Sequence, residues 1–464
     1  MAIGQFFTAH WLMNRWDRLR TSFWFLPSTL AVVATGLSFL LIQVDTWVGT
    51  KLVQQLGWLY TFGPEGARAI LSAIAGSMIT VAGLTFSITM LTLQLASSQF
   101  GPRLLRNFMR DRGNQVVLGT FISTFIYCLL VLRTVRGTDE SSFVPHLSVA
   151  FGVILAIASI AVLIFFIHHT ATSIRIETLL AQLASDARCA IDRLFPSEMG
   201  DEPPAHASGR IEQISLHDFG GNAQPISAPS SGYVQHIDGD LLMQLAIEHD
   251  LIVRIEAPPG SFVAAHDAVL TTFSDHCISD ETLGKLRQVA VIGDDRTPTQ
   301  DLEFSIRRIV EIAQRALSPG INDPTTALYC IDRLEEAFGY LAQRNPPSPA
   351  RYDQTGRLRV VVEVVRFDEL VCSAFSALAR YAGSDADVVS RILAALFRLR
   401  AKAPPDQRQA LSDVHEATFR FSQEALPYDA DKAAVYKAYQ HGSRSGEFLV
   451  NRRETDFGCG PTPR

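Results

Sequence analysis

The fold is decided by one stretch, residues 69–100, which reads AILSAIAGSMITVAGLTFSITMLTLQLASSQF. It contains no charged residue. A hydrocarbon core about 30 Å thick needs about 20 helical residues, so this stretch can cross a bilayer and extend beyond it. Its small and polar residues recur at helical spacing, with one bulky member, on one face of the predicted helix. These residues, which form the stripe of this helix, are Ser72, Gly76, Thr80, Gly83, Ser87, Met90, Gln94 and Ser98.

Two interpretations of this stripe remain open. Small residues let helix backbones approach closely, and hydroxyl groups bond across such an interface. Alternatively, the stripe lines a pore or cavity, with Gln94 and Ser98 near one mouth. Lipid does not select for such a polar face. Both interpretations hold together if the helix packs against copies of itself.

The hydropathy pattern predicts an α-helical membrane protein with four transmembrane helices, at about residues 23–42, 69–99, 115–133 and 145–174. Residues 43–68 are expected to form the first connection. Tryptophan and arginine residues alternate with apolar residues before the first helix, so residues 1–22 are expected to lie at the membrane interface.

The distribution of basic residues predicts the orientation. Three arginines precede the first helix and four follow the second, whereas the first and third connections have two basic residues each. The positive-inside rule therefore places both termini in the cytoplasm of a bacterial inner membrane. His168 and His169 then lie at the cytoplasmic edge, either as an interfacial polar pair or as groups that titrate near neutral pH.

The rest of the chain is expected to form a cytoplasmic α+β region. An amphipathic helix and linker (175–207) lead to a small β-sandwich (208–295), a helical domain (296–440) and a disordered tail (441–464). The rhythm of residues 228–270 resembles the β-sandwich of lipoyl and biotinyl carrier domains. No lysine occurs between Ala228 and Thr272, so neither lipoate nor biotin is expected.

One loop between two predicted helices has the residues of an anion site. A helix N-terminus that follows a glycine offers free N–H groups. The alternatives are a turn between the helices, with Gly320 at positive φ and Asp323 as N-cap, or a contact between the soluble domain and the membrane helices. The residues are Ser318, Gly320, Asn322, Asp323, Thr325 and Thr326.

Several classes of function are disfavoured by composition. The net charge of −6 gives no reason to expect nucleic acid binding. The six cysteines are scattered without a CxxC pair, and the His–Asp pairs lack the spacing of metal ligands. We therefore expect no metal, no cofactor and no catalytic residues, and an enzyme is the weakest hypothesis.

Two motifs resemble those of a known family. They are LTFSITMLTLQLASSQFGPRLL, from Leu84, and ALSPGINDPTTA, from Ala316. They look like the signatures of a bacterial predicted-membrane-protein family of unknown function (domain-of-unknown-function family 2254). The resemblance implies a bacterial inner-membrane protein with this domain order, and no activity, substrate or catalytic residue.

The function we expect is a homo-oligomeric, channel-like protein. The second helix lines a passage and the cytoplasmic region assembles or gates it. The expected partners are the lipid bilayer, copies of the same chain and a small ion. The alternative is a membrane-anchored scaffold or sensor without transport activity. No acidic or basic residue lies inside the predicted spans before Arg133, which closes the third span, and this disfavours ion-coupled transport.

Overall fold

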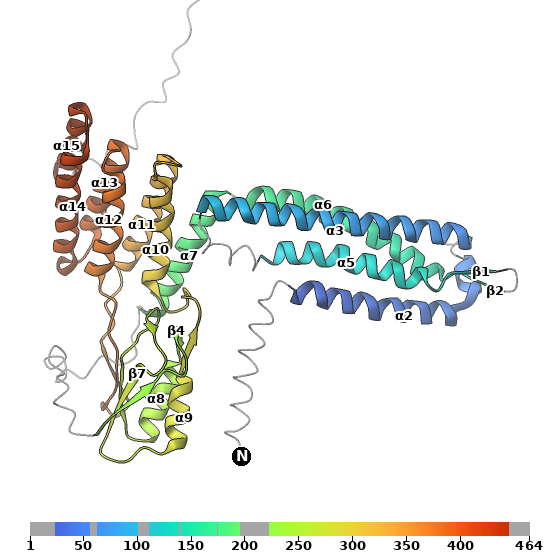
Figure 1. The fold of residues 1–464 in the computed structure, drawn as a ribbon, viewed down its shortest axis with the longest axis horizontal. Helices are drawn as coiled ribbons and strands as arrows, with labels where there is room; N and C mark the ends of the chain where they lie inside the picture. The colour runs from blue at the N-terminus through green and yellow to red at the C-terminus, as the bar shows by residue number, and fades with distance from the viewer. Residues whose placement is uncertain are drawn as a thin grey trace, which may run out of the picture. The chain divides into compact units, whose positions relative to one another are not determined.

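The computed structural model describes residues 24–55, 63–100, 111–138, 141–173, 175–194 and 222–444 (Figure 1). The chain divides into two compact units, residues 1–178 and residues 179–464. Several expectations lie outside the described residues: the interfacial segment 1–22, the arginine-rich run at 103–110, most of the linker before residue 208, and the tail after residue 444.

The first unit contains four helices that are long and apolar enough to cross a membrane, as the hydropathy pattern predicts. The prediction that residues 43–68 form a loop between the first two helices is wrong. The first helix continues well beyond its apolar window, which ends at Trp47, so residues 43–55 are helical rather than loop. The helices are α2 (Phe25–Gln55), α3 (Pro64–Phe100), α5 (Arg112–Leu132) and α6 (His146–Ser173); the strands β1 (Arg136–Thr138) and β2 (Ser141–Phe143) form a hairpin between α5 and α6.

Helix α5 forms the centre of this unit. It packs against α2, α3 and α6, and half of its apolar window is buried, against 28% for α3 and 17% for α2 and α6. A side chain at Gly119 would meet Leu30 Cδ1 at 2.7 Å and the backbone of Pro27 at 3.1 Å. Glycine therefore permits the close approach of α5 and α2.

Polar contacts tie the helix ends together. The Asp45 carboxylate on α2 accepts hydrogen bonds from the N–H groups of Leu147 and Ser148, each at 2.9 Å, and from the Ser148 hydroxyl at 2.6 Å. A carboxylate at this position satisfies the orphan donors at the N-terminus of α6 and complements its dipole. The Arg68 guanidinium donates to the carbonyl of Val135 at 3.0 Å.

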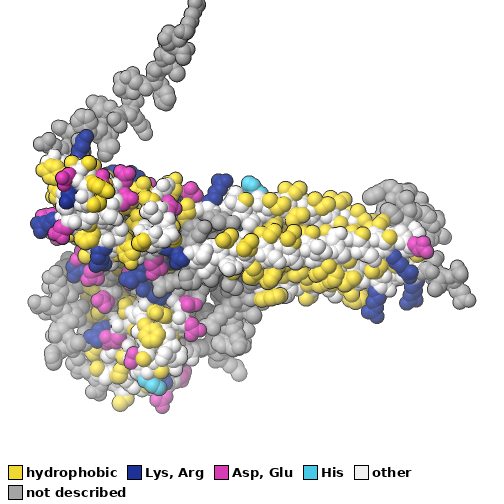
Figure 2. Space-filling view, turned by 45° about the horizontal axis from the view of Figure 1, so that its top comes forward, with side chains coloured by type: hydrophobic (Ala, Val, Ile, Leu, Met, Phe, Trp, Pro, Cys, Tyr) yellow, Lys and Arg dark blue, Asp and Glu magenta, His cyan; other side chains and the backbone are white. Residues whose placement is uncertain are grey.

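The outer surface of the four-helix unit is apolar. Figure 2 shows hydrophobic side chains along its visible face, with charged side chains toward its ends. Trp24 and Trp47 stand at the two ends of the apolar window of α2 and are 67% and 92% exposed. Tryptophan favours membrane–water interfaces, so this arrangement matches a bilayer between the two indoles.

The second unit begins with α7 (Ile176–Leu194), most of which belongs to it, and then forms two sheets. The larger sheet has the strand order β3-β7-β5-β10-β9, and the smaller has the order β6-β4-β8. The elements are β3 (Asn222–Ser227), β4 (Gly232–Ile237), α8 (Gly239–Glu248), β5 (Ile252–Ile255), β6 (Phe262–Val263), β7 (Ala268–Ser274), α9 (Asp280–Val289), β8 (Ala290–Gly293), β9 (Ala350–Tyr352) and β10 (Leu358–Val361).

The expected small β-sandwich is not confirmed. Both sheets share one hydrophobic core, but α8 and α9 contribute Leu242, Leu245 and Leu286 to that core. In addition, β10 pairs in parallel with β5, so a strand from the expected helical domain lies inside the larger sheet. The alternation of apolar and polar residues indicates strands at β5 and β10, but it does not indicate that they pair about a hundred residues apart.

Apart from β9 and β10, the elements of the second unit from residue 302 to residue 444 are helices. Phe338 on α11 lies in their core, with its ring centroid 5.5 Å from that of Phe375 and 6.0 Å from that of Phe367. Helix α7 joins them through Asp192, which accepts hydrogen bonds from the Tyr340 hydroxyl and Arg344, each at 2.6 Å. The helices are α10 (Leu302–Ala316), α11 (Pro324–Leu341), α12 (Phe367–Ala382), α13 (Ala386–Lys402), α14 (Pro405–Ala425) and α15 (Asp429–Arg444).

A buried histidine joins α14 to α15. The His415 ring stacks on that of Tyr439 with a centroid separation of 4.9 Å. Its Nε2 atom is buried without a hydrogen-bond partner among the described residues. Burial, assisted by the positive charge of Arg400, lowers the pKa of His415 from 6.5 to about 4. The folded chain therefore holds this imidazole neutral.

This histidine predicts a loss of stability in mild acid. Because the folded-state pKa lies below the unfolded value, protons bind the unfolded chain first as the pH falls from 6.5 toward 4. Over that range, the titration of His415 lowers the free energy of unfolding by about 3 kcal/mol. Hydrogen exchange of α14 and α15 peptides, corrected for intrinsic rates, should show weaker protection at pH 5 than at pH 7.5. His415→Phe should abolish this difference, and exposed His276→Gln should preserve it. An unchanged pH dependence in His415→Phe would contradict the assignment.

Candidate functional site

The strongest candidate site is the α3 stripe. The structure places all eight residues, Ser72, Gly76, Thr80, Gly83, Ser87, Met90, Gln94 and Ser98, on the exposed surface of the single chain. The face of α3 that packs on the rest of the unit carries a different set, namely Ala67, Leu71, Ala75, Met78, Ala82 and Thr85. Among the described residues, the stripe is therefore not part of the packed face of α3.

The two faces of α3 are neighbours around the helix. Ser72, Gly76 and Gly83 each follow a buried residue directly, so the stripe is rotated by about 100° from the packed face. A Cβ atom built on Gly76 or Gly83 meets nothing within 4 Å. Both glycines thus leave open space beside the helix rather than accommodating a neighbour in the same chain.

The hydroxyl groups of the stripe are satisfied by the helix itself. Thr80 donates to the carbonyl of Gly76 at 2.8 Å, and Ser87 donates to that of Gly83 at 2.9 Å. Such bonding lowers the cost of placing a hydroxyl against an apolar neighbour. The pattern Gly76-xxx-Thr80 and Gly83-xxx-Ser87 is a small-xxx-small arrangement, which suits the close approach of a second helix.

The stripe on α3 extends past the N-terminal end of the central helix, α5. Ala82 clusters with Val117 and Leu118, and α3 runs antiparallel to α5. Val117 lies five residues after Arg112, the first residue of α5. At the same helical rise, α3 reaches the level of Arg112 at about residue 87. Met90, Gln94 and Ser98 therefore lie past the start of α5, as Figure 1 also shows for the end of α3. Met90 belongs to one end of the stripe and not to its middle.

The second candidate, the loop at residues 318–326, forms a compact turn between α10 and α11. The Asp323 carboxylate accepts hydrogen bonds from the Thr326 N–H at 3.1 Å and the Thr326 hydroxyl at 2.6 Å. This carboxylate stands where an anion would bind at the start of α11, so the geometry favours the turn over the anion site. Ser318 donates to the Arg315 carbonyl, and Gly320 and Thr325 are exposed.

The glycine of this loop does not play the expected role. Asn322, with φ of 50°, holds the left-handed position, and Gly320 is not among the residues with positive φ. Asparagine tolerates this conformation because its side chain can bond locally. The expectation that Gly320 supplies the positive φ was therefore wrong.

The polar contacts at the helix ends are not predictable from local sequence. Asp45 lies in the segment expected to be a loop, and only the fold brings it to the start of α6. His169 Nε2 lies 2.6 Å from the Asp111 Oδ2 atom, and Asp111 also caps α5 through the Gly113 N–H at 2.9 Å. His168 is exposed on the same turn. An aspartate before a helix signalled the cap, but nothing in the sequence indicated its partner.

The fold and the stripe define a class of protein, a predicted membrane protein with four apolar helices and a mixed C-terminal unit. The chain belongs to the family described as "Predicted membrane protein (DUF2254)", whose family model matches residues 20–398.

Similar proteins occur in mycobacteria. Uncharacterized proteins of Mycobacterium tuberculosis strain H37Rv and Mycobacterium bovis are each 32% identical to this chain over 447 residues. The match covers 93% of this chain and 82% of each relative. No solved structure matches the chain significantly.

The loop geometry predicts opposite results for two neighbouring positions. Asn322→Ala should lower stability by about 1 kcal/mol, because alanine is strained at positive φ. Gly320→Ala should be neutral, because an added Cβ meets nothing within 4 Å. Thermal unfolding of the purified protein, with hydrogen exchange of residues 316–327, measures both. Asn322→Gly serves as the control and should retain stability. A larger loss from Gly320→Ala than from Asn322→Ala would refute this account of the loop.

Proposed function

We propose that this protein is a homo-oligomeric, channel-like protein of the bacterial inner membrane, in which copies of α3 surround a passage. The observation that supports the proposal is the exposure of the whole α3 stripe on the single chain, with open space at Gly76 and Gly83. Lipid gains nothing from a face of glycine and hydroxyl residues, whereas a second helix packs closely on it.

In this proposal the stripe has two parts. Ser72 to Ser87 run beside the packed bundle, where close helix approach is favoured. Met90 and Gln94 lie beyond the start of α5, where copies of α3 meet near a mouth. A ring of Met90 side chains there forms a hydrophobic constriction, and such rings close a pore by dewetting. The second unit assembles the subunits or gates the passage, and the solute is a small ion.

A scaffold or sensor that moves no solute is the competing function. The hydroxyls of Thr80 and Ser87 bond within α3 and are compatible with this function, because they suit a dry helix–helix interface as well as a passage. Assembly through the stripe is common to both functions. A measurement of ion passage distinguishes the channel from the scaffold or sensor.

The proposed orientation places both termini in the cytoplasm. The basic residues Arg68, Arg133 and Arg136 flank one end of the bundle, and fewer basic residues lie in those connections than before α2 and after α3. That difference supports the orientation. The proposal includes no catalytic activity, no cofactor and no nucleic acid partner.

Assembly through the stripe predicts a position-specific effect of bulk. Gly83→Leu should shift the protein from oligomer to monomer, because leucine fills the space that a second helix needs. Gly36→Leu on α2 is the matched control, since Gly36 also has nothing within 4 Å of an added Cβ. Native mass spectrometry and crosslinking in native membranes measure the subunit number. A wild-type monomer under both conditions would exclude this assembly.

The passage predicts a leak on removal of the constriction. Met90→Ser should raise ion flux several-fold in liposomes that contain the purified protein, because a polar ring wets. Ile88→Ser should leave the flux unchanged, since Ile88 is exposed to a similar degree, 37% against 42% for Met90, but lies on another face. If oligomers form and neither the wild type nor Met90→Ser passes ions, the scaffold function replaces the channel.

A further inference from the structure

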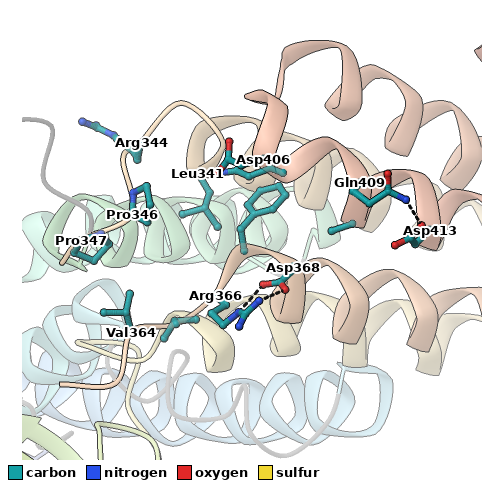
Figure 3. Close-up of a pocket in the computed structure, with 14 residues that line it drawn as sticks. Leu341, Arg344, Pro346, Pro347, Val364, Arg366, Asp368, Asp406, Gln409 and Asp413 are labelled. Atoms are coloured by element: carbon teal, nitrogen blue, oxygen red, sulfur yellow. Dashed lines mark hydrogen bonds and ion pairs between the residues drawn. The ribbon is translucent and has the colours of Figure 1, made fainter. Parts of the chain in front are cut away.

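Many arginines of the second unit pair with carboxylates of the same chain. Figure 3 shows an example in a cavity of about 490 Å³ beside the start of α12, where Arg366 donates to both carboxylate oxygens of Asp368, at 3.1 and 2.6 Å. Arg398 pairs with Glu335 in the same way, at 2.5 Å. The charge of these guanidinium groups is neutralised within the chain.

Three arginines at one end of the first unit are different. Arg68 lies near the start of α3, Arg133 is the C-cap residue of α5, and Arg136 is the first residue of β1. All three are exposed, and they form the arginine group of the first unit. The Arg68 guanidinium donates to the Val135 carbonyl at 3.0 Å, which holds it beside the turn that carries the other two. Figure 2 shows basic side chains at one end of this unit, next to its apolar surface.

The arginine group has no carboxylate partner within the described residues. In the described segments of the first unit, the one ion pair joins His169 to Asp111, at the other end of α5. Asp45 lies at the same end as the arginine group, but its carboxylate accepts three hydrogen bonds from the start of α6. Glu65 is exposed and forms no ion pair with Arg68, three residues further along α3. The positive charges of the group are therefore accessible to a molecule outside the chain.

The arginine group stands at the boundary of the apolar surface. Arg68 directly precedes the uncharged stretch of α3, and Arg133 directly follows the last residue of α5. Leu129 is 42% exposed and lies four residues before Arg133, so both side chains share one face of α5. Trp47, at the same end of the unit, is 92% exposed and indicates the level of the membrane–water interface. A molecule bound here meets guanidinium groups beside an apolar helix face.

We propose that the arginine group binds the phosphate head group of an anionic phospholipid, whose acyl chains lie along the face of α5 that carries Leu129. A guanidinium group matches the oxygens of a phosphate and pairs with them through two hydrogen bonds. Basic pockets beside transmembrane helices recognise anionic head groups in this manner. The proposal requires the apolar helices to cross a membrane, but it does not depend on whether α3 lines a passage.

Native mass spectrometry of the full-length protein, delipidated in detergent, tests the site with phosphatidylglycerol and with phosphatidylcholine of the same acyl chains. We expect the first phosphatidylglycerol to bind about fivefold more tightly or better, because the choline group places a positive charge beside the arginines. Millimolar inorganic phosphate should not displace the lipid, since it makes no apolar contact. Equal binding of the two lipids would overturn the proposal. Displacement by phosphate would overturn it as well, because it would assign the site to a free anion.

Paired variants locate the binding. Arg133→Gln combined with Arg136→Gln leaves the bond between Arg68 and Val135 intact. It should weaken binding of the first phosphatidylglycerol about 20-fold, at about fivefold for each arginine, and leave phosphatidylcholine binding unchanged.

The matched control is Arg112→Gln combined with Arg175→Gln, which removes two exposed arginines from the other end of the first unit. This pair should leave binding of the first phosphatidylglycerol unchanged. Thermal unfolding in detergent verifies that both pairs fold. An equal loss in the two pairs would show a general attraction of lipid to basic flanks, and no loss in the first pair would place the lipid elsewhere; either result would refute the site.

Discussion

The membrane unit depends on close packing around α5. Besides the contacts of Asp45 with the start of α6, hydrogen bonds between the described parts of these helices join the Thr124 and Ser159 hydroxyls, 3.3 Å apart, and the Tyr127 hydroxyl with the Ser148 carbonyl, at 2.9 Å. In a bilayer, helices gain little from the hydrophobic effect and associate through van der Waals contact. Gly119 on α5 and the alanines of α3 bring the backbones near enough for that contact.

The same packing leaves a second face of α3 exposed among the described residues of the chain. The residues of α3 that contact α5 are mostly alanine and leucine, and the stripe is rotated away from them by about one residue. A helix with small residues on two different faces can pack closely against another helix on each face. One place is occupied by α5, and the other gives the proposed assembly its physical basis.

Charged side chains make different kinds of contact in the two units. In the first unit, carboxylates act at helix ends: Asp45 caps α6 and Asp111 caps α5 while it contacts His169. In the second unit, ion pairs join neighbouring elements, for example Arg398 on α13 with Glu335 on α11.

The sequence by itself determined the four apolar helices, the α10–α11 turn and the residues of the stripe, because each depends on local periodicity or on capping within a few residues. Tertiary structure alone decided which helix is central, which face of α3 is packed, and that β10 completes the sheet of β5. These features depend on contacts between residues distant in the chain. Asp45 illustrates the difference, since its carboxylate bonds to Ser148 only because α6 packs beside α2 in the fold.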